Sequence, residues 1–474
     1  MRREERIAPM PRSVDPTSVS EDVMTGDGWT SSLQRSLGRL VSTSSLLSLA
    51  RIAGAAAGLA TQILLARTLT ASGLGIFYSV TSLAAVMGVI AALGYPGIAS
   101  RFVSRFREKG REDLLAAFIV HARKTVTRYA AAATIGVLAF AVFWPGLALE
   151  IRLATAAAAL AIPANAALRL NGALAASFRQ FALAYLPDTC IRPFVLLAGL
   201  MLLIAAGVAM TAALATCVLT VTFTGLAVVQ YRQLTRTAPG ADGSAASPPS
   251  RYLRVWRREA PPLVLVALFT FFFADVDILL VTLLLPSAET AIVGLCLKLA
   301  LLVGFAVQVA HQVVVPDLAD AHARKEHAAI HGVVLKAFGF PLAVMLGAIV
   351  VVALWGETIL SLFGPEFSGA KLPLLILLGS QLARVLFGPS VALLSVVGAQ
   401  RENAMLAVGA LVVLALANVA LVPAAGVIGA ALAVVLAMIV WLGACAVVLA
   451  RVSGLRTDVL HLAFRAPMES ARPR

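Results

Sequence analysis

A long apolar stretch that contains two carboxylates sets the tightest limit on how this chain folds. It runs from Pro261 to Pro286 (PPLVLVALFTFFFADVDILLVTLLLP) and holds Asp275 and Asp277 in its second half. About 20 apolar residues in a helix cross the roughly 30 Å hydrocarbon core of a bilayer. A carboxylate at the centre of such a helix costs on the order of 2.5–3.5 kcal/mol, so it normally faces a protein interior or a water-filled space. The stretch therefore predicts a membrane-spanning helix beside a polar cavity.

The same apolar character extends over most of the chain. Hydrophobic residues make up 60% of the sequence and charged residues 13%, and the mean hydropathy is +0.91. This is the composition of a polytopic membrane protein. The apolar segments long enough to span a bilayer are approximately 42–66, 74–95, 128–148, 152–172, 187–206, 210–230, 261–285, 291–315, 333–356, 372–396, 404–423 and 427–450. An all-α membrane protein with about twelve transmembrane helices is expected.

Polar segments divide the chain into five parts. Residues 1–40 are rich in Ser, Arg and Pro, lack the pattern of a secretory signal peptide, and are predicted to be a disordered cytosolic tail. An N-terminal six-helix lobe (41–230), a cytosolic inter-lobe linker (231–258), a C-terminal six-helix lobe (259–450) and a cytosolic tail (451–474) follow. Because each lobe has an even number of spans, both begin on the same side of the membrane. Two parallel lobes around a central cavity are the expected architecture.

The basic residues indicate the orientation of the chain. With the N-terminus in the cytosol, 32 of the 38 Lys and Arg residues fall in cytosolic segments, whereas three (Arg67, Arg152 and Lys371) fall outside. The positive-inside rule therefore places both termini in the cytosol. The positive excess indicates topology first and attraction to anionic membrane lipids second. Binding of nucleic acid would need a soluble basic module, which these segments do not resemble.

Three cations and one amide inside the predicted spans are candidates for binding a substrate. Arg51, Lys298 and Arg384 suit an anionic group such as a pyrophosphate, because Arg offers a planar fork and Lys a point charge. In the alternative interpretation, Arg51 and Lys298 extend toward the nearest membrane surface. Gln62 offers an amide that either bonds a sugar or bridges two helices.

The two acids of the opening stretch are expected to have different roles. Asp275 and Asp277 are two residues apart, so their side chains point about 200° apart on a helix. One is expected to couple transport to H+ or Na+ in the cavity, with Asp275 slightly favoured, and the other to be structural, with Lys298 as its partner. No cofactor or metal site is expected. The cysteines lack metal-ligand spacing and are interpreted as small hydrophobic residues: Cys190, Cys217, Cys296 and Cys445.

Four stretches together resemble the polysaccharide transporter branch of the MOP flippase superfamily. LARIAGAAAGLATQILLARTLTASGLGIFY (49–78) is similar to the start of that family's first two helices, and LGYPGIASR (93–101) to the end of its second. ADVDILLVTLLLPSAETAIVGLCLKLALL (274–302) resembles its Asp-containing seventh helix and the start of the eighth. LFGPEFSGAKLPLLIL (362–377) resembles the entry into its tenth helix. The order and spacing of these stretches agree with the family over most of residues 40–450.

The resemblance implies a MATE-like fold and the translocation of a lipid-linked oligosaccharide, carried on polyprenyl pyrophosphate. The membrane would be the bacterial cytoplasmic (inner) membrane, and the pathway the synthesis of a surface polysaccharide such as lipopolysaccharide or exopolysaccharide. Polysaccharide polymerase and glycosyltransferases of that pathway are the implied partners. A lipid II flippase and a multidrug or cation antiporter of the same superfamily are the alternatives. A membrane glycan polymerase or ligase is less expected, because the outer loops carry few catalytic candidates, and we predict that the protein is not an enzyme.

The orientation can be tested with a cysteine in the predicted linker. In a variant that carries Ser244→Cys and lacks the four native cysteines, we expect a membrane-impermeant thiol reagent to label the introduced thiol in opened vesicles but not in intact cells. The reason is the distribution of basic residues, which holds residue 244 in the cytosol. Labelling from outside intact cells would contradict this topology.

Overall fold

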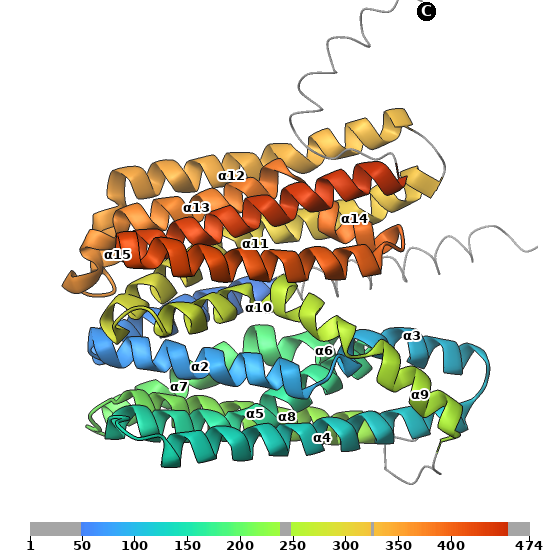
Figure 1. The fold of residues 1–474 in the computed structure, drawn as a ribbon, viewed down its shortest axis with the longest axis horizontal. Coiled ribbons are helices and arrows are strands. Elements are labelled where there is room, and N and C mark those ends of the chain that lie inside the picture. The colour runs from blue at the N-terminus through green and yellow to red at the C-terminus, as the bar shows by residue number, and fades with distance from the viewer. Residues whose placement is uncertain (1–48, 238–247, 324–326, 454–474) are drawn as a thin grey trace, which may run out of the picture. The chain divides into compact units, whose positions relative to one another are not determined.

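The computed structural model describes residues 49–237, 248–323 and 327–453, and within these ranges the regular structure is helical (Figure 1). The predicted tail 1–40 lies outside the described residues, as does most of the predicted tail 451–474. The first half contains the Leu49–Thr68 helix, α2 (Ala71–Ala91), α3 (Tyr95–Glu108), α4 (Glu112–Phe143), α5 (Leu149–Ser177), α6 (Phe181–Leu186), the π-helical turn η1 (Pro187–Ile191), α7 (Arg192–Ala205) and α8 (Ala212–Thr237). The second half contains α9 (Ser250–Glu259), α10 (Pro262–Thr282), α11 (Ser287–Ala323), α12 (His327–Ser361), the 3-10 turn η2 (Pro365–Ala370), α13 (Lys371–Leu386), α14 (Ser390–Val396) and α15 (Gln400–Ser453).

The number of membrane spans follows from the length and bending of these helices. Ten of the described helices are long and apolar enough to cross a membrane. The segments Ser250–Thr270 and Phe272–Thr282, which meet at a bend of 76° inside α10, give an eleventh when they are counted as one span. Helix α15 has 54 residues, or about 80 Å at 1.5 Å per residue, which is far too long for one crossing. It reverses at Gly426, where φ is +56°, so that Gly429 packs against the carbonyl oxygen of Leu421. Helix α15 therefore makes two crossings, which agrees with the predicted twelve spans over the described residues.

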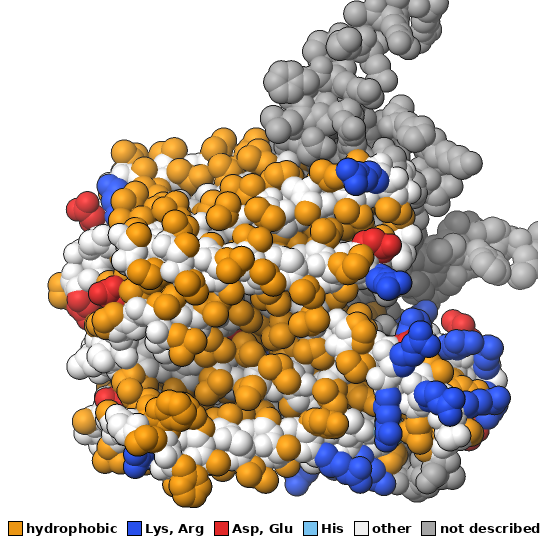
Figure 2. All heavy atoms as spheres, in the orientation of Figure 1, with side chains coloured by type: hydrophobic (Ala, Val, Ile, Leu, Met, Phe, Trp, Pro, Cys, Tyr) orange, Lys and Arg blue, Asp and Glu red, His pale blue; other side chains and the backbone are white. Residues whose placement is uncertain are grey.

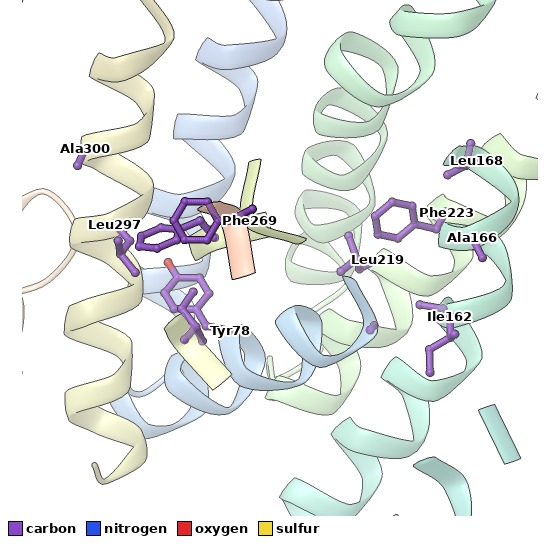
Figure 3. Packing of buried hydrophobic residues seen from close by; sticks show 14 of the residues in the cluster. Tyr78, Ile162, Ala166, Leu168, Leu219, Phe223, Phe269, Leu297 and Ala300 are labelled. Atoms are coloured by element: carbon purple, nitrogen blue, oxygen red, sulfur yellow. The ribbon is translucent and has the colours of Figure 1, made fainter. Parts of the chain in front are cut away.

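The helices divide by sequence into the two predicted lobes, which α2 joins through its packing against α10 and α11 (Figure 1). In the N-terminal lobe, α5 packs against α2, α4 and α8. Most of the buried residues of α5 are alanines, which allow neighbouring helices to approach closely. Leu219 and Phe223 of α8 lie beside Ile162 and Ala166 of α5 (Figure 3). In the C-terminal lobe, α15 packs against α10 and α13, and α11 against α12 and α13.

The polar segment between the lobes contains a helix as well as connecting chain. Helix α8 continues to Thr237, and α9 then buries Trp256 completely against aromatic residues of the N-terminal lobe. The Trp256 ring centroid lies 5.1 Å from that of Phe118 and 6.3 Å from that of Phe102. Arg101 of α3 also forms an ion pair with Glu259 at the end of α9. These contacts fix the beginning of α10 to the N-terminal lobe.

Lys and Arg side chains gather at the end of the molecule where α3 and α9 meet, while apolar side chains cover the helices between the two ends (Figure 2). We call this the basic end. At the opposite end, the two lobes contact each other. Arg67 donates hydrogen bonds to the carbonyl oxygens of Leu362 (2.8 Å) and Ser361 (2.9 Å) beyond α12. Gly75 of α2 lies against the carbonyl oxygen of Ser287, leaving no space for a side chain. The lobes are therefore joined at this end as well as through the ion pair of Arg101 with Glu259 at the basic end.

A hydroxyl pair gives a direct test of this contact. The Oγ atom of Ser79 on α2 lies 2.7 Å from the Oγ1 atom of Thr282 on α10. In a background without native cysteines, we expect Ser79→Cys combined with Thr282→Cys to form a disulfide under mild oxidation. Disulfides require Cβ atoms within about 3.5–4.5 Å of each other, and this geometry is close to that requirement.

The cross-link is measured by cleaving an engineered protease site between residues 238 and 247, which separates the two lobes on a denaturing gel unless they are linked. Ser79→Cys combined with Thr270→Cys is the control, because Thr270 lies on the other side of the bend in α10. Equal separation of the fragments in both pairs would contradict the observed lobe contact.

Candidate functional site

A cavity of about 500 Å³ lies between helices of the membrane-spanning part. Its walls come from the Leu49–Thr68 helix, α2, α5, α7 and α8, and from α10 and α11 of the C-terminal lobe. A second hollow of about 410 Å³ adjoins it and shares Asn165, Arg169, Asp188, Phe223 and Phe272 as walls. Each volume is within the range of pockets that bind small molecules. The two hollows together are called the central cavity below.

Helix α5 supplies the first cation of the central cavity. Asn165 follows Pro163 by two residues. Arg169 is four residues further along and lies on the same face of the helix. The Nε atom of Arg169 donates a hydrogen bond to Oδ1 of Asn165 at 3.0 Å. The guanidinium carbon lies 3.8 Å from the ring centroid of Phe272 on α10. Arg169 is thus held by an amide on one side and an aromatic face on the other.

The π-helical turn η1 supplies an acid and a second cation. Pro187 begins this turn and has no backbone N–H to donate, which favours a local departure from α-helical geometry. Such turns inside helices are frequent at functional sites. Asp188 and Arg192 lie on one face and form an ion pair, with 3.3 Å between Oδ1 and Nε. The guanidinium carbon of Arg192 lies 5.4 Å from the ring centroid of Phe223.

Helix α11 supplies the third cation. The Nζ atom of Lys298 lies 4.9 Å from the ring centroid of Tyr78, and the Tyr78 hydroxyl donates a 2.7 Å hydrogen bond to Oε1 of Gln62. One turn before Lys298, the absence of a side chain at Gly294 leaves room for the Tyr78 ring, which a Cβ atom there would meet at 2.5 Å. Gln62 and Lys298, from different lobes, therefore meet around one tyrosine.

The two carboxylates of α10 lie on opposite sides of that helix, as their spacing requires. Asp275 lines the central cavity, where Ser82 donates a 2.9 Å hydrogen bond to its Oδ1 atom. Asp277 is fully buried on the other side and accepts a 2.9 Å hydrogen bond from Nδ2 of Asn418 on α15. The expectation that Lys298 pairs with the structural acid therefore does not hold for Asp277, because Lys298 lies on the cavity side. Asn418 takes that place.

The other two predicted cations lie outside the central cavity in this structure. The guanidinium carbon of Arg51 lies 5.5 Å from the ring centroid of Tyr185. Arg384 lines a separate cavity of about 140 Å³ in the C-terminal lobe. The structure thus brings Gln62, Lys298 and Asp275 together, and it does not bring Arg51 or Arg384 to them.

Sequence reasoning missed three charged residues of the central cavity. Arg169, Asp188 and Arg192 lie near the ends of the predicted spans 152–172 and 187–206 and were not among the candidate residues. In the structure α5 extends to Ser177 and α6 begins at Phe181, so all three residues lie within helices. The spacing of four residues between Asn165 and Arg169, repeated between Asp188 and Arg192, was the available signal. It indicates two helical faces, each with a polar pair.

Aromatic rings at the central cavity are in contact with cations of the protein itself. Each of the three cations lies within about 6 Å of a ring centroid, the range of a cation–π interaction. Asp275 lies in the electrostatic field of all three cations. Asp188 is paired with Arg192. Three cations and two carboxylates give the cavity a positive balance and leave few free aromatic faces for a cationic ligand.

Comparisons with solved structures identify the fold. A multidrug resistance MATE family transporter of the MOP superfamily, in an inward-facing conformation, has a TM-score of 0.61 at 16% identity, covering 84% of this chain and 98% of that one. The lipid II flippase MurJ, in an inward closed conformation, has a TM-score of 0.67 at 12% identity, covering 90% and 93%. The chain has the MATE-like fold of the MOP superfamily.

A third similar structure is a MOP superfamily transporter from Pyrococcus furiosus described as having a binding pocket of reverse polarity. Its TM-score is 0.56 at 14% identity, covering 86% of this chain and 95% of that one. No protein-family model matches the sequence, and no curated protein matches it either. The likeness at these identities concerns the fold, so the charges of the central cavity are the guide to what the protein binds.

Proposed function

We propose that this protein is a flippase that moves a lipid-linked oligosaccharide across the bacterial cytoplasmic membrane by alternating access. The substrate is a polyprenyl-pyrophosphate glycan destined for a surface polysaccharide. The observation that carries the proposal is the set of three cations, Arg169, Arg192 and Lys298, that line a cavity inside a membrane-spanning bundle. Polysaccharide polymerase and glycosyltransferases of the same pathway are its proposed partners.

The chemistry of the cavity matches an anionic head group attached to sugars. Pyrophosphate in hydrocarbon would lose its hydration, and guanidinium and ammonium groups replace that hydration with charge-assisted hydrogen bonds. The amides of Gln62 and Asn165 and the hydroxyl of Thr81 line the same cavity and suit sugar hydroxyls. Outward-facing apolar side chains on the helices suit the lipid tail, which stays in the bilayer (Figure 2).

Export of cationic drugs is the second candidate, because one similar structure is a multidrug transporter. A cationic drug would need free carboxylates or aromatic faces. In the central cavity, Asp188 is engaged by Arg192, and protein cations lie over the rings of Phe223 and Phe272, which line it, and over the buried ring of Tyr78 behind Lys298. The electrostatics therefore favour an anionic substrate. A lipid II flippase would share this chemistry and differs in the attached glycan.

The lobe contacts suggest which side of the cycle this conformation represents. Arg67, Gly75 and Ser79 join the lobes at the end opposite the basic end. If the basic end is cytosolic, as the positive-inside rule requires, this conformation is closed toward the outside. A substrate formed on the cytosolic side would enter the central cavity in such a state.

Removing the cavity cations should slow transport of an anionic lipid. In vesicles reconstituted with purified protein and a fluorescent polyprenyl-pyrophosphate oligosaccharide, we expect Arg169→Met or Lys298→Met to lower the initial flipping rate about 10-fold or more. A charge-assisted hydrogen bond contributes about 1.5–3 kcal/mol, and about 1.4 kcal/mol corresponds to tenfold in rate. Quenching of the outer-leaflet fluorophore measures the rate.

Arg105→Met is the matched control. Arg105 is exposed on α3, so this substitution removes one positive charge outside the cavity. Equal rates for wild type, Arg105→Met and both cavity variants would contradict the anionic-substrate proposal. Faster uptake of a cationic dye by wild type than by protein-free vesicles, without flipping of the anionic lipid, would favour drug export instead.

The two carboxylates of α10 should respond differently to neutralisation. We propose that Asp275 couples transport to a proton or sodium gradient and that Asp277 is structural. Asp275→Asn should slow flipping and flatten its dependence on pH or sodium, while the yield of folded protein stays near that of wild type, because an amide oxygen still accepts from Ser82. Asp277→Ala should lower the folded yield, because it leaves the buried Asn418 amide without its partner. If the flipping rate of Asp275→Asn depends on pH and sodium in the same way as that of wild type, the coupling role is ruled out.

A further inference from the structure

A second buried polar site lies in the C-terminal lobe, apart from the central cavity. It is the cavity of about 140 Å³ between α10, α11, α13 and α15. Its polar side chains are Thr270, Ser380, Gln381 and Arg384, and the rest of its lining is apolar. It shares no lining residue with the central cavity among the described residues.

The polar atoms of this cavity lack partners. The Nε atom of Arg384, the Oγ1 atom of Thr270 and the Oε1 atom of Gln381 are buried and make no hydrogen bond to any described residue. Gln381 is 4% exposed, and its Nε2 atom donates a 3.1 Å hydrogen bond to Oγ of Ser380. Because the Ser380 hydroxyl donates to the carbonyl oxygen of Leu377 at 2.6 Å, it accepts from Gln381 and fixes that amide with its oxygen free. The hydroxyl hydrogen of Thr270 rotates, so Thr270 and Arg384 can present donors to the cavity.

The positive charge of Arg384 has no acid beside it in the described part of the cavity. No carboxylate lines the described walls, and Asp277, further along α10, accepts from Asn418. Arg384 lies in the last turn of α13, where the partial negative charge of the helix end compensates it weakly. The cost of burying an unpaired guanidinium is several times larger than that effect. The described side chains therefore supply no counter-charge to this partly buried guanidinium, whose Nε atom is buried without a partner.

We propose that this cavity binds a small inorganic anion of the size of chloride, with Arg384 as its main ligand and Thr270 as a further donor. A volume of about 140 Å³ is several times the roughly 30 Å³ that one water occupies in the liquid, so it holds such an anion with a few waters. It is much smaller than the central cavity of about 500 Å³. The anion neutralises the Arg384 guanidinium in the cavity between α10 and α13 and stabilises the folded C-terminal lobe.

Thermal unfolding of the purified protein tests this site without any lipid substrate. Chloride is titrated against gluconate at constant sodium and ionic strength. A ligand that binds the folded state alone raises the folded-to-unfolded ratio by 1 + [L]/Kd, so above Kd each tenfold increase in chloride should raise this ratio about tenfold. We expect wild type to be stabilised in this way and Arg384→Met to lose the response. Arg384→Met should still fold. The substitution removes the charge that needs the anion, so the variant has no buried charge left unpaired when chloride is absent.

Two matched variants and one structural measurement identify the site. Arg169→Met, in the central cavity, and Arg105→Met, on the surface, should keep the chloride response. Crystals grown with bromide should show an anomalous peak beside the Arg384 guanidinium in wild type and none there in Arg384→Met. A response that is absent in wild type, that persists in Arg384→Met, or that is lost in Arg169→Met would overturn the proposal. Since no lipid transport enters these measurements, their failure is distinct from failure of the proposed flippase activity.

Discussion

The free-energy cost of placing charge inside a bilayer governs the arrangement of this protein. Charged side chains within the spans would each cost on the order of 2.5–3.5 kcal/mol at the centre of a lipid-exposed helix. In the central cavity, the charged groups instead face one another and aromatic rings. Arg169 lies between Asn165 and Phe272, and Arg192 lies between Asp188 and Phe223.

Interruptions of regular helix occur beside the residues that line the cavities. Pro163 precedes Asn165 in α5, and the π-helical turn begins one residue before Asp188. Helix α10 departs from helical dihedral angles at Phe272, three residues before Asp275. An interrupted helix changes the direction in which the following side chains point and frees backbone groups, which membrane proteins tolerate where the backbone is buried or lines a cavity. The interruptions thus connect local sequence to the position of each polar group.

The number of spans and the opposite facing of Asp275 and Asp277 were predictable, because both follow from helix length and helical spacing. The central cavity was predictable in part. Gln62 and Lys298 stood out as polar residues inside apolar segments, whereas Arg169 and Arg192 were hidden because they lie near the ends of such segments, in α5 and at the start of α7. Partners from distant segments were not predictable at all. The hydrogen bond from Asn418 to Asp277 joins residues 141 positions apart, and no local pattern specifies it.

The two lobes hold their cations in different ways, and this difference fits the two roles proposed above, binding of a transported substrate and stabilisation of one lobe. In the central cavity, Lys298 and Arg169 come from different lobes, so the distance between them changes when the lobes move relative to each other. A ligand held by both cations has different contacts in each lobe arrangement, and only such a difference shifts a conformational equilibrium. Arg384 comes from α13 and faces Thr270 of α10 within one lobe. An anion bound there keeps its ligands as the lobes move, and it therefore stabilises the lobe without driving the transport cycle.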